Sequence, residues 1–155
     1  MLPLFVICNE IIKKANMDNI MDLTPMKLQK LLYFIYGAYY AKYGEKLFAE
    51  NFEAWQRGPV ISSVYHEFKI YGANPIVNYS SDAEGNVYFL NQDNEEVKKF
   101  FSVFTAVWEQ YKNIGAIELS DMTHKEGTPW SETFCNGIID DTKILKYFKE
   151  QYNFI

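Results

Sequence analysis

The fold is decided by the stretch Leu23-Thr24-Pro25-Met26-Lys27-Leu28-Gln29-Lys30-Leu31-Leu32-Tyr33-Phe34. Thr24 is a natural N-cap residue, and Pro25 stands at the first helical position, where the missing N–H costs nothing. The stretch therefore predicts a helix that begins at Pro25. Gly44 is the expected residue just beyond its end, because glycine adopts the left-handed conformation that closes many helices.

Apolar side chains cover most of this predicted helix. At about 100° per residue, one arc of its surface is apolar and a set of tyrosines extends that arc around the side. The arc holds Leu28, Leu31, Leu32, Ile35, Ala38 and Tyr39, and the extension holds Tyr33, Tyr36, Tyr40 and Tyr43. A helix that is apolar almost all round belongs at the centre of a domain. Gly37, on the remaining narrow face, would let another backbone come close.

Further helices are predicted on both sides of the central one. Asn94 is the expected cap of the clearest of them, whose apolar residues recur at steps of three and four. The others are expected over Leu4 to about Met17, from Pro59 to Gly72, from Ile114 to about Thr123, and from Asp140 to about Tyr152.

Two short β-prone regions complete the predicted architecture. Residues 48–56 should form a strand, and residues 75–79 and 87–90 should pair as a small hairpin across a turn-forming segment. We therefore expect an α+β fold, mostly α: a compact bundle of about six helices around the second helix, with a small antiparallel β element. Residues 1–155 are expected to form a single domain.

A corner follows the predicted strand, in the run Ala54-Trp55-Gln56-Arg57-Gly58-Pro59-Val60. Arg57 is the only arginine of the chain, and its planar, five-donor group suits a specific carboxylate or carbonyl partner. We expect it to be an interior clamp of the corner. The alternative is an exposed arginine, which would be a natural hot spot of a protein interface.

Charge and composition exclude several classes of protein. Residues 1–81 hold eight Lys/Arg and seven Asp/Glu (+1), and residues 82–155 hold seven and thirteen (−6). No cluster of basic residues is present, so direct nucleic-acid binding is not expected, and a basic partner suits the acidic half better. We expect no membrane partner and a cytoplasmic location, with Cys8 and Cys135 as free thiols.

The residues that could carry catalysis form no convincing site. Ser120 and His124 would share a helix face, but no nucleophile-elbow motif surrounds the serine, and helix caps explain both residues. The two histidines stand in no metal-ligand spacing, and no phosphate-binding glycine loop is present, so no metal and no cofactor are expected. Lys27 and Lys30 could meet an acidic partner, although pairing within the chain is the favoured interpretation.

Three segments together resemble the Panacea domain of phage-associated and SocA-like antitoxins. They are residues 23–34 and 54–60, quoted above, and Thr123-His124-Lys125-Glu126-Gly127-Thr128-Pro129-Trp130. Their order and spacing also fit, and they organise the chain from about residue 5 to residue 135. The resemblance implies framework roles for Thr24, Lys27, Lys30, Trp55, Arg57, Gly58, Pro59, His124 and Trp130.

The resemblance also implies a function: binding to a co-encoded protein toxin, in a bacterial or prophage toxin–antitoxin system, without catalysis. Some relatives are described as adaptors that present the toxin to a protease, which stays an alternative. A small phage-associated enzyme using Ser120, His124 or the Lys27/Lys30 pair is a second, and a transcriptional regulator is a third. The sequence also leaves open a homo-oligomer.

Overall fold

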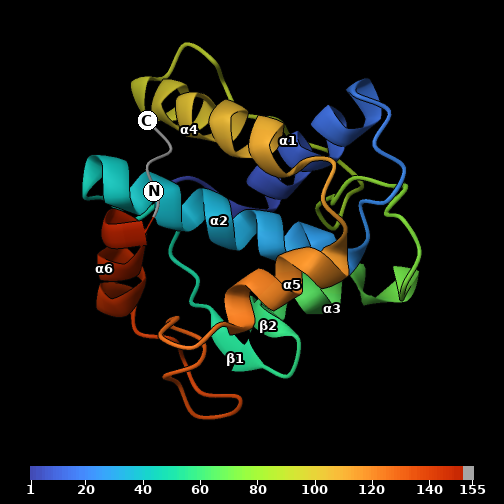
Figure 1. Ribbon diagram of the computed structural model, residues 1–155. Helices are drawn as coiled ribbons and strands as arrows, with labels where there is room; N and C mark the ends of the chain where they lie inside the picture. Colours follow the sequence, from blue (N-terminus) through green and yellow to red (C-terminus); the bar gives the residue numbers. More distant parts are fainter. Residues whose placement is uncertain (152–155) are drawn as a thin grey trace.

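The computed structural model describes residues 1–151, and Figure 1 shows its elements. Within this range the six α-helices are α1 (Leu4–Met17), α2 (Pro25–Tyr43), α3 (Ser62–Phe68), α4 (Glu95–Tyr111), α5 (Ala116–His124) and α6 (Asp141–Gln151). A short 3-10 helix, η1 (Lys69–Tyr71), follows α3, and the two strands are β1 (Glu53–Trp55) and β2 (Gly58–Val60). None of the helices in this range has the length and apolar character needed to cross a membrane. The predicted end of α6 at Tyr152 lies outside the described residues.

Helix α2 is the centre of the molecule, as its apolar surface predicted. The Thr24 hydroxyl accepts a hydrogen bond from the Lys27 N–H (3.3 Å), and the Gly44 N–H closes the other end on the Tyr40 carbonyl (2.9 Å). Every residue from Lys27 to Tyr39 is buried. In Figure 1, α4 lies along one side of α2, and α5 and α6 pack against the opposite side at its two ends.

Aromatic side chains fill the space around α2. Phe34 stacks on Tyr111 of α4, with ring centroids 4.6 Å apart, and Tyr33 meets Phe52 edge to face at 5.2 Å. Gly37 faces α6, where a Cβ at this position would lie 2.3 Å from the Phe148 ring. The glycine therefore admits an aromatic side chain, whereas the sequence led us to expect a second backbone.

The β element is a hairpin of two short strands joined by the two-residue turn Gln56-Arg57, at the predicted corner. Strands β1 and β2 pair antiparallel, with Ala54 opposite Pro59 and Trp55 opposite Gly58. The expectation that Pro59 starts a helix is wrong: Pro59 lies in β2, and α3 begins three residues later. Proline is tolerated in β2 because this is an edge strand, where an absent N–H leaves no partner unpaired. On the far side of β1, residues 136–139 add backbone hydrogen bonds to Phe52 and Ala54.

The predicted hairpin of residues 75–79 and 87–90 is also wrong, since neither run forms a strand although both lie in the described part of the chain. Side chains of α1 instead take up backbone groups of the second run and of Ser80, which directly follows the first run. The Asn9 amide accepts from the Ser80 N–H (2.8 Å) and donates to the Ser80 and Tyr88 carbonyls. The buried Glu10 carboxylate accepts from the Leu90 N–H (2.8 Å). With these groups engaged by α1, no ladder forms between the two runs.

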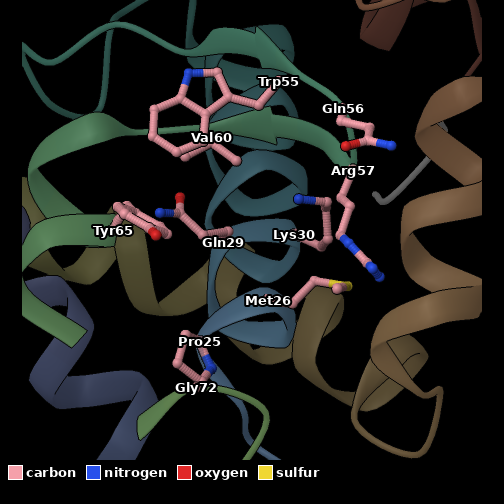
Figure 2. Close-up of a pocket in the computed structure, with 10 residues that line it drawn as sticks. All are labelled: Pro25, Met26, Gln29, Lys30, Trp55, Gln56, Arg57, Val60, Tyr65 and Gly72. Atoms are coloured by element: carbon pink, nitrogen blue, oxygen red, sulfur yellow. The ribbon is translucent and has the colours of Figure 1, made fainter. Parts of the chain in front are cut away.

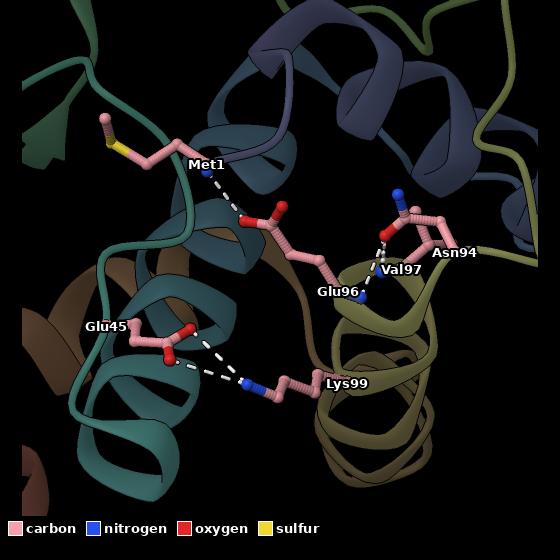
Figure 3. Close-up of polar contacts among 6 residues, drawn as sticks. All are labelled: Met1, Glu45, Asn94, Glu96, Val97 and Lys99. Carbon is pink, nitrogen blue, oxygen red and sulfur yellow. Dashed lines mark hydrogen bonds and ion pairs between the residues drawn. The ribbon is translucent and has the colours of Figure 1, made fainter.

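Polar contacts hold the start of α4 against neighbouring elements, as Figure 3 shows. Asn94 caps the helix as predicted, accepting from the N–H groups of Glu96 (2.8 Å) and Val97 (3.2 Å). The Glu96 carboxylate pairs with the amino group of Met1 at 2.7 Å, and Lys99 lies 3.5 Å from Glu45, just after α2. The second pair is exposed and contributes little stability.

We predict that Gly37→Ala destabilises the protein. In a helix interior free of contacts, this change stabilises by up to about 1 kcal/mol. Here the added methyl group would collide with the Phe148 ring, and overpacking of this kind costs about 1–3 kcal/mol. Urea denaturation should show a lower free energy of unfolding for the variant.

A Phe148→Leu background is the matched control, because it shortens the side chain that the new methyl group meets. Gly37→Ala should cost less in that background than in the wild type, giving a favourable coupling energy in a double-mutant cycle. A rise in the urea midpoint for Gly37→Ala alone would contradict the packing described for this contact.

Candidate functional site

The β1–β2 corner is fastened to α2 by two polar side chains. The Gln29 side-chain carbonyl accepts from the Ile61 N–H (2.9 Å), and its amide group donates to the Ile61 carbonyl (3.0 Å). The Lys30 ammonium donates to the Pro59 carbonyl (3.1 Å). Both side chains are buried, so these contacts replace hydrogen bonds to water that the helix and the corner cannot make. The corner is thus an integral part of the core.

Gly58 allows the corner to lie this close to its neighbours. Its φ of +114° is a backbone conformation that L side chains rarely adopt. A Cβ here would also lie 2.6 Å from the Thr123 hydroxyl oxygen and 2.7 Å from Cε of Lys30. A glycine is therefore required for both reasons, and the corner fits between α2 and α5.

Helix α5 and the loop after it hold the opposite side of the corner. The Ser120 hydroxyl donates to the Arg57 carbonyl (2.5 Å), and the Trp130 indole N–H donates to the Trp55 carbonyl (2.7 Å). The ring of His124 packs against the Trp130 indole, with centroids 4.1 Å apart. The structure therefore brings together the third quoted segment and the corner, although about seventy residues separate them in the sequence.

Burial lowers the pKa values of two basic side chains next to the corner, Lys30 and His124. It lowers the pKa of Lys30 to about 7 from an ordinary value of 10.5. It also lowers the pKa of His124, and the nearby positive charge of Lys30 acts in the same direction. The imidazole is therefore mostly neutral at pH 7 and serves as an aromatic packing partner of Trp130.

Arg57 is exposed, so our expectation of an interior clamp is wrong. The corner is held through the backbone carbonyl of this residue and the side chains of Gln29 and Lys30, leaving the guanidinium outside. Within residues 1–151 the guanidinium makes no ion pair. It borders a pocket of about 340 Å³, drawn in Figure 2 and lined by Pro25, Met26, Gln29, Lys30, Trp55, Gln56, Arg57, Val60, Tyr65 and Gly72.

Thr24 and Lys27 lie apart from the corner, at the start of α2. The Lys27 ammonium is fully buried and donates to the Asp22 carboxylate (2.8 Å) and to the Lys112 carbonyl at the end of α4 (2.6 Å). The favoured interpretation of pairing within the chain is therefore confirmed for Lys27. For Lys30 the partner within the chain is a carbonyl and not a carboxylate.

Two residues that contact the corner were not singled out as site residues from the sequence. Gln29 was quoted only as part of the central helix, and Thr123 only as the expected end of a helix and within the third segment. A glutamine in the middle of a helix that is apolar all round is a signal that could have identified the first, because a buried amide needs a partner. Thr123 gave no such signal, because a threonine in a helix can satisfy its hydroxyl within the helix. Here its hydroxyl donates to the Ser120 carbonyl, one turn earlier (2.6 Å).

Comparison with known proteins agrees with this arrangement. The family described as "Antitoxin SocA-like, Panacea domain" matches residues 28–131. The chain belongs to this family. The matched part of the Panacea domain includes Gln29, Lys30, the whole β1–β2 corner, α5 and Trp130, and it begins just after Thr24 and Lys27.

A curated relative of this Panacea-domain chain is "Antitoxin SocA" of Caulobacter vibrioides (strain NA1000 / CB15N). The two sequences are 28% identical over 127 residues, which is 81% of this chain and 65% of the relative. The chain thus spans slightly less than two thirds of the length of the relative that it matches. No solved structure matches the chain.

The lowered pKa of Lys30 predicts a pH-dependent stability. Between the folded pKa of about 7 and the ordinary value of 10.5, the unfolded chain binds a proton that the folded chain releases. The free energy of unfolding therefore rises with pH in this window, by at most about 1.4 kcal/mol per pH unit from this group. Urea denaturation between pH 7 and pH 9 should show a shallower rise for Lys30→Met than for the wild type.

Lys27→Met is the matched control for Lys30→Met, because it also removes a buried ammonium from α2, but one that has a carboxylate partner. This variant should be less stable than the wild type yet keep the rise with pH. Parallel pH curves for the wild type and Lys30→Met would show that Lys30 does not titrate in this range.

Proposed function

We propose that this protein is an antitoxin that neutralises a co-encoded protein toxin by direct binding, in a bacterial or prophage toxin–antitoxin system. The observation that carries the proposal is membership of the SocA-like Panacea-domain family, together with the similarity to "Antitoxin SocA". We also propose that the protein is cytoplasmic and that residues 1–155 form one domain. Helices α1, α2, α4, α5 and α6 share one hydrophobic core, which supports the single domain.

The contacts of the Ser120 and His124 side chains favour a binding protein over an enzyme. A nucleophilic serine needs its hydroxyl hydrogen-bonded to a general base. The Ser120 hydroxyl instead donates to the Arg57 carbonyl, and the His124 ring packs on Trp130. Both side chains thus serve the corner, and we propose that the protein acts without catalysis or a bound cofactor.

Charge supports a toxin that is basic. The formal net charge of the chain is −5, and residues 82–155 carry the whole excess of carboxylates. Charge complementarity accelerates encounter between protein partners and suppresses wrong ones. The excess of acidic side chains over residues 82–151 would therefore favour a cationic partner.

Co-expression with the adjacent gene tests the proposal. Expression of that gene alone should arrest growth, and this protein should restore it. Phe34→Asp is a suitable negative control, since a charge in the stacked Phe34–Tyr111 pair should prevent folding. If the adjacent gene is harmless alone, or remains toxic in the presence of this protein, the antitoxin assignment is wrong.

Titration of the purified toxin distinguishes masking from catalysis. A binding antitoxin should abolish the toxin's activity only when about one equivalent has been added. Ser120→Ala and His124→Ala variants that still fold should neutralise the toxin as well as the wild type. Inactivation of excess toxin by a small fraction of an equivalent, lost in either variant, would show that the protein is an enzyme.

A further inference from the structure

The pocket beside the corner has cationic side chains and no acidic ones. Lys30 and Arg57 are its two charged lining residues. Of the two buried lysines in residues 1–151, Lys27 has the Asp22 carboxylate as a partner, whereas Lys30 has only the Pro59 carbonyl. The Arg57 guanidinium, exposed at the rim, has no carboxylate partner among the described residues either. An anionic group entering this pocket would therefore meet the charge of Arg57, and it would favour the protonated form of the Lys30 amine.

The walls of the pocket are apolar. Trp55 and Tyr65 form one side, with ring centroids 5.0 Å apart, and Pro25, Met26 and Val60 contribute further apolar surface, as Figure 2 shows. The Trp55 indole N–H is already bound to the Glu53 carboxylate (3.1 Å), so the ring is oriented before any partner arrives. Tryptophan, tyrosine and arginine are the residues most enriched in the energetic centres of protein interfaces.

A second pocket extends the first into a groove. It has a volume of about 610 Å³, shares Met26, Arg57 and Gly72 with the first, and continues to Ile117 on α5. Asp22 and Glu118 also line this second pocket, so the part of the groove that suits an anionic group is the first pocket. Ile117 is an exposed large apolar side chain, 69% accessible. We call the two pockets together the Arg57 groove, because Arg57 lines both. Its extent suits a peptide segment better than a single side chain.

We propose that the Arg57 groove binds a segment of the toxin in which an Asp or Glu side chain lies beside an aromatic or aliphatic one. The carboxylate pairs with the two-pronged guanidinium of Arg57, and the apolar neighbour packs against Trp55, Tyr65 and Met26. Lys30 lies behind this contact, and an incoming carboxylate would favour the protonated form of its amine, whose pKa burial lowers to about 7. This inference rests on the proposed function, because it names the contact surface for the toxin.

The groove is compatible with a toxin that is basic overall. An acidic segment of the toxin would enter the groove, while the excess of acidic side chains in residues 82–151 would attract its basic remainder. The two charge patterns together would fix the orientation of the toxin, since reversing it would oppose like charges.

Arg57→Glu and Arg57→Lys test the proposal. The reversal should weaken binding of the purified toxin at least 100-fold, because it opposes the incoming carboxylate. The lysine variant should weaken binding about 10-fold, because it keeps the charge and loses the second hydrogen bond. Both variants should keep the wild-type melting temperature, since the side chain is exposed and the corner is held through backbone groups.

Lys149→Glu is the matched control, because it makes the same change of charge at an exposed position on α6, outside the groove. Its affinity for the toxin should stay within about twofold of the wild type. Calorimetric titration with the toxin protein measures all four affinities. If a folded Arg57→Glu variant binds the toxin within threefold of the wild-type affinity, the Arg57 groove is not the toxin-binding surface, and the proposed antitoxin function is unaffected.

Selection for toxin variants that again bind Arg57→Glu identifies the partner group. The expected suppressors replace an Asp or Glu of the toxin by Lys or Arg, and they should weaken binding to the wild-type antitoxin. Suppressors that change no acidic residue would overturn the carboxylate assignment. If the wild-type protein itself neither binds the toxin nor restores growth, the proposed function is wrong, and so is the proposal that the Arg57 groove binds the toxin.

Discussion

The burial of α2 on every side is the constraint on which the rest of the structure depends. Lys27, Gln29 and Lys30 are buried together with the leucines and aromatic residues around them. A buried polar group must find a partner or cost free energy, and a buried charge costs more. These three side chains therefore determine which backbone lies next to α2: residue 112 at the end of α4, and residues 59 and 61 in and after β2.

The corner thus has two sides with different roles. Its inner side consists of backbone groups that receive hydrogen bonds from Gln29, Lys30, Ser120 and Trp130. Its outer side presents the Arg57 guanidinium and the Trp55 ring to the groove. Because the inner contacts use the backbone of Arg57, its side chain is free to serve a partner. A rigid support of this kind reduces the entropy lost on binding.

Much of the fold could be predicted from the sequence, because caps and apolar periodicity are local signals. Thr24, Pro25 and Gly44 marked the limits of α2, and Asn94 marked the start of α4. The errors arose where a distant partner decided the outcome. Asn9 removes the backbone groups of residues 80 and 88 from any ladder, and nothing within residues 75–90 announces this contact. For Arg57, the flanking Trp55 and Gly58-Pro59 predicted a tight corner. They could not show that the backbone of Arg57 faces inward while its side chain faces outward.

Native-state hydrogen exchange of the Ile61 amide tests most directly the claim that the corner is part of the α2 core. This N–H donates to the Gln29 side chain and to no strand. If the corner and α2 unfold together, Ile61 should exchange with the same opening free energy as the amides of Leu31 and Leu32. An Ile61 opening free energy several kcal/mol lower would contradict the account, because the corner would then open while α2 stays folded.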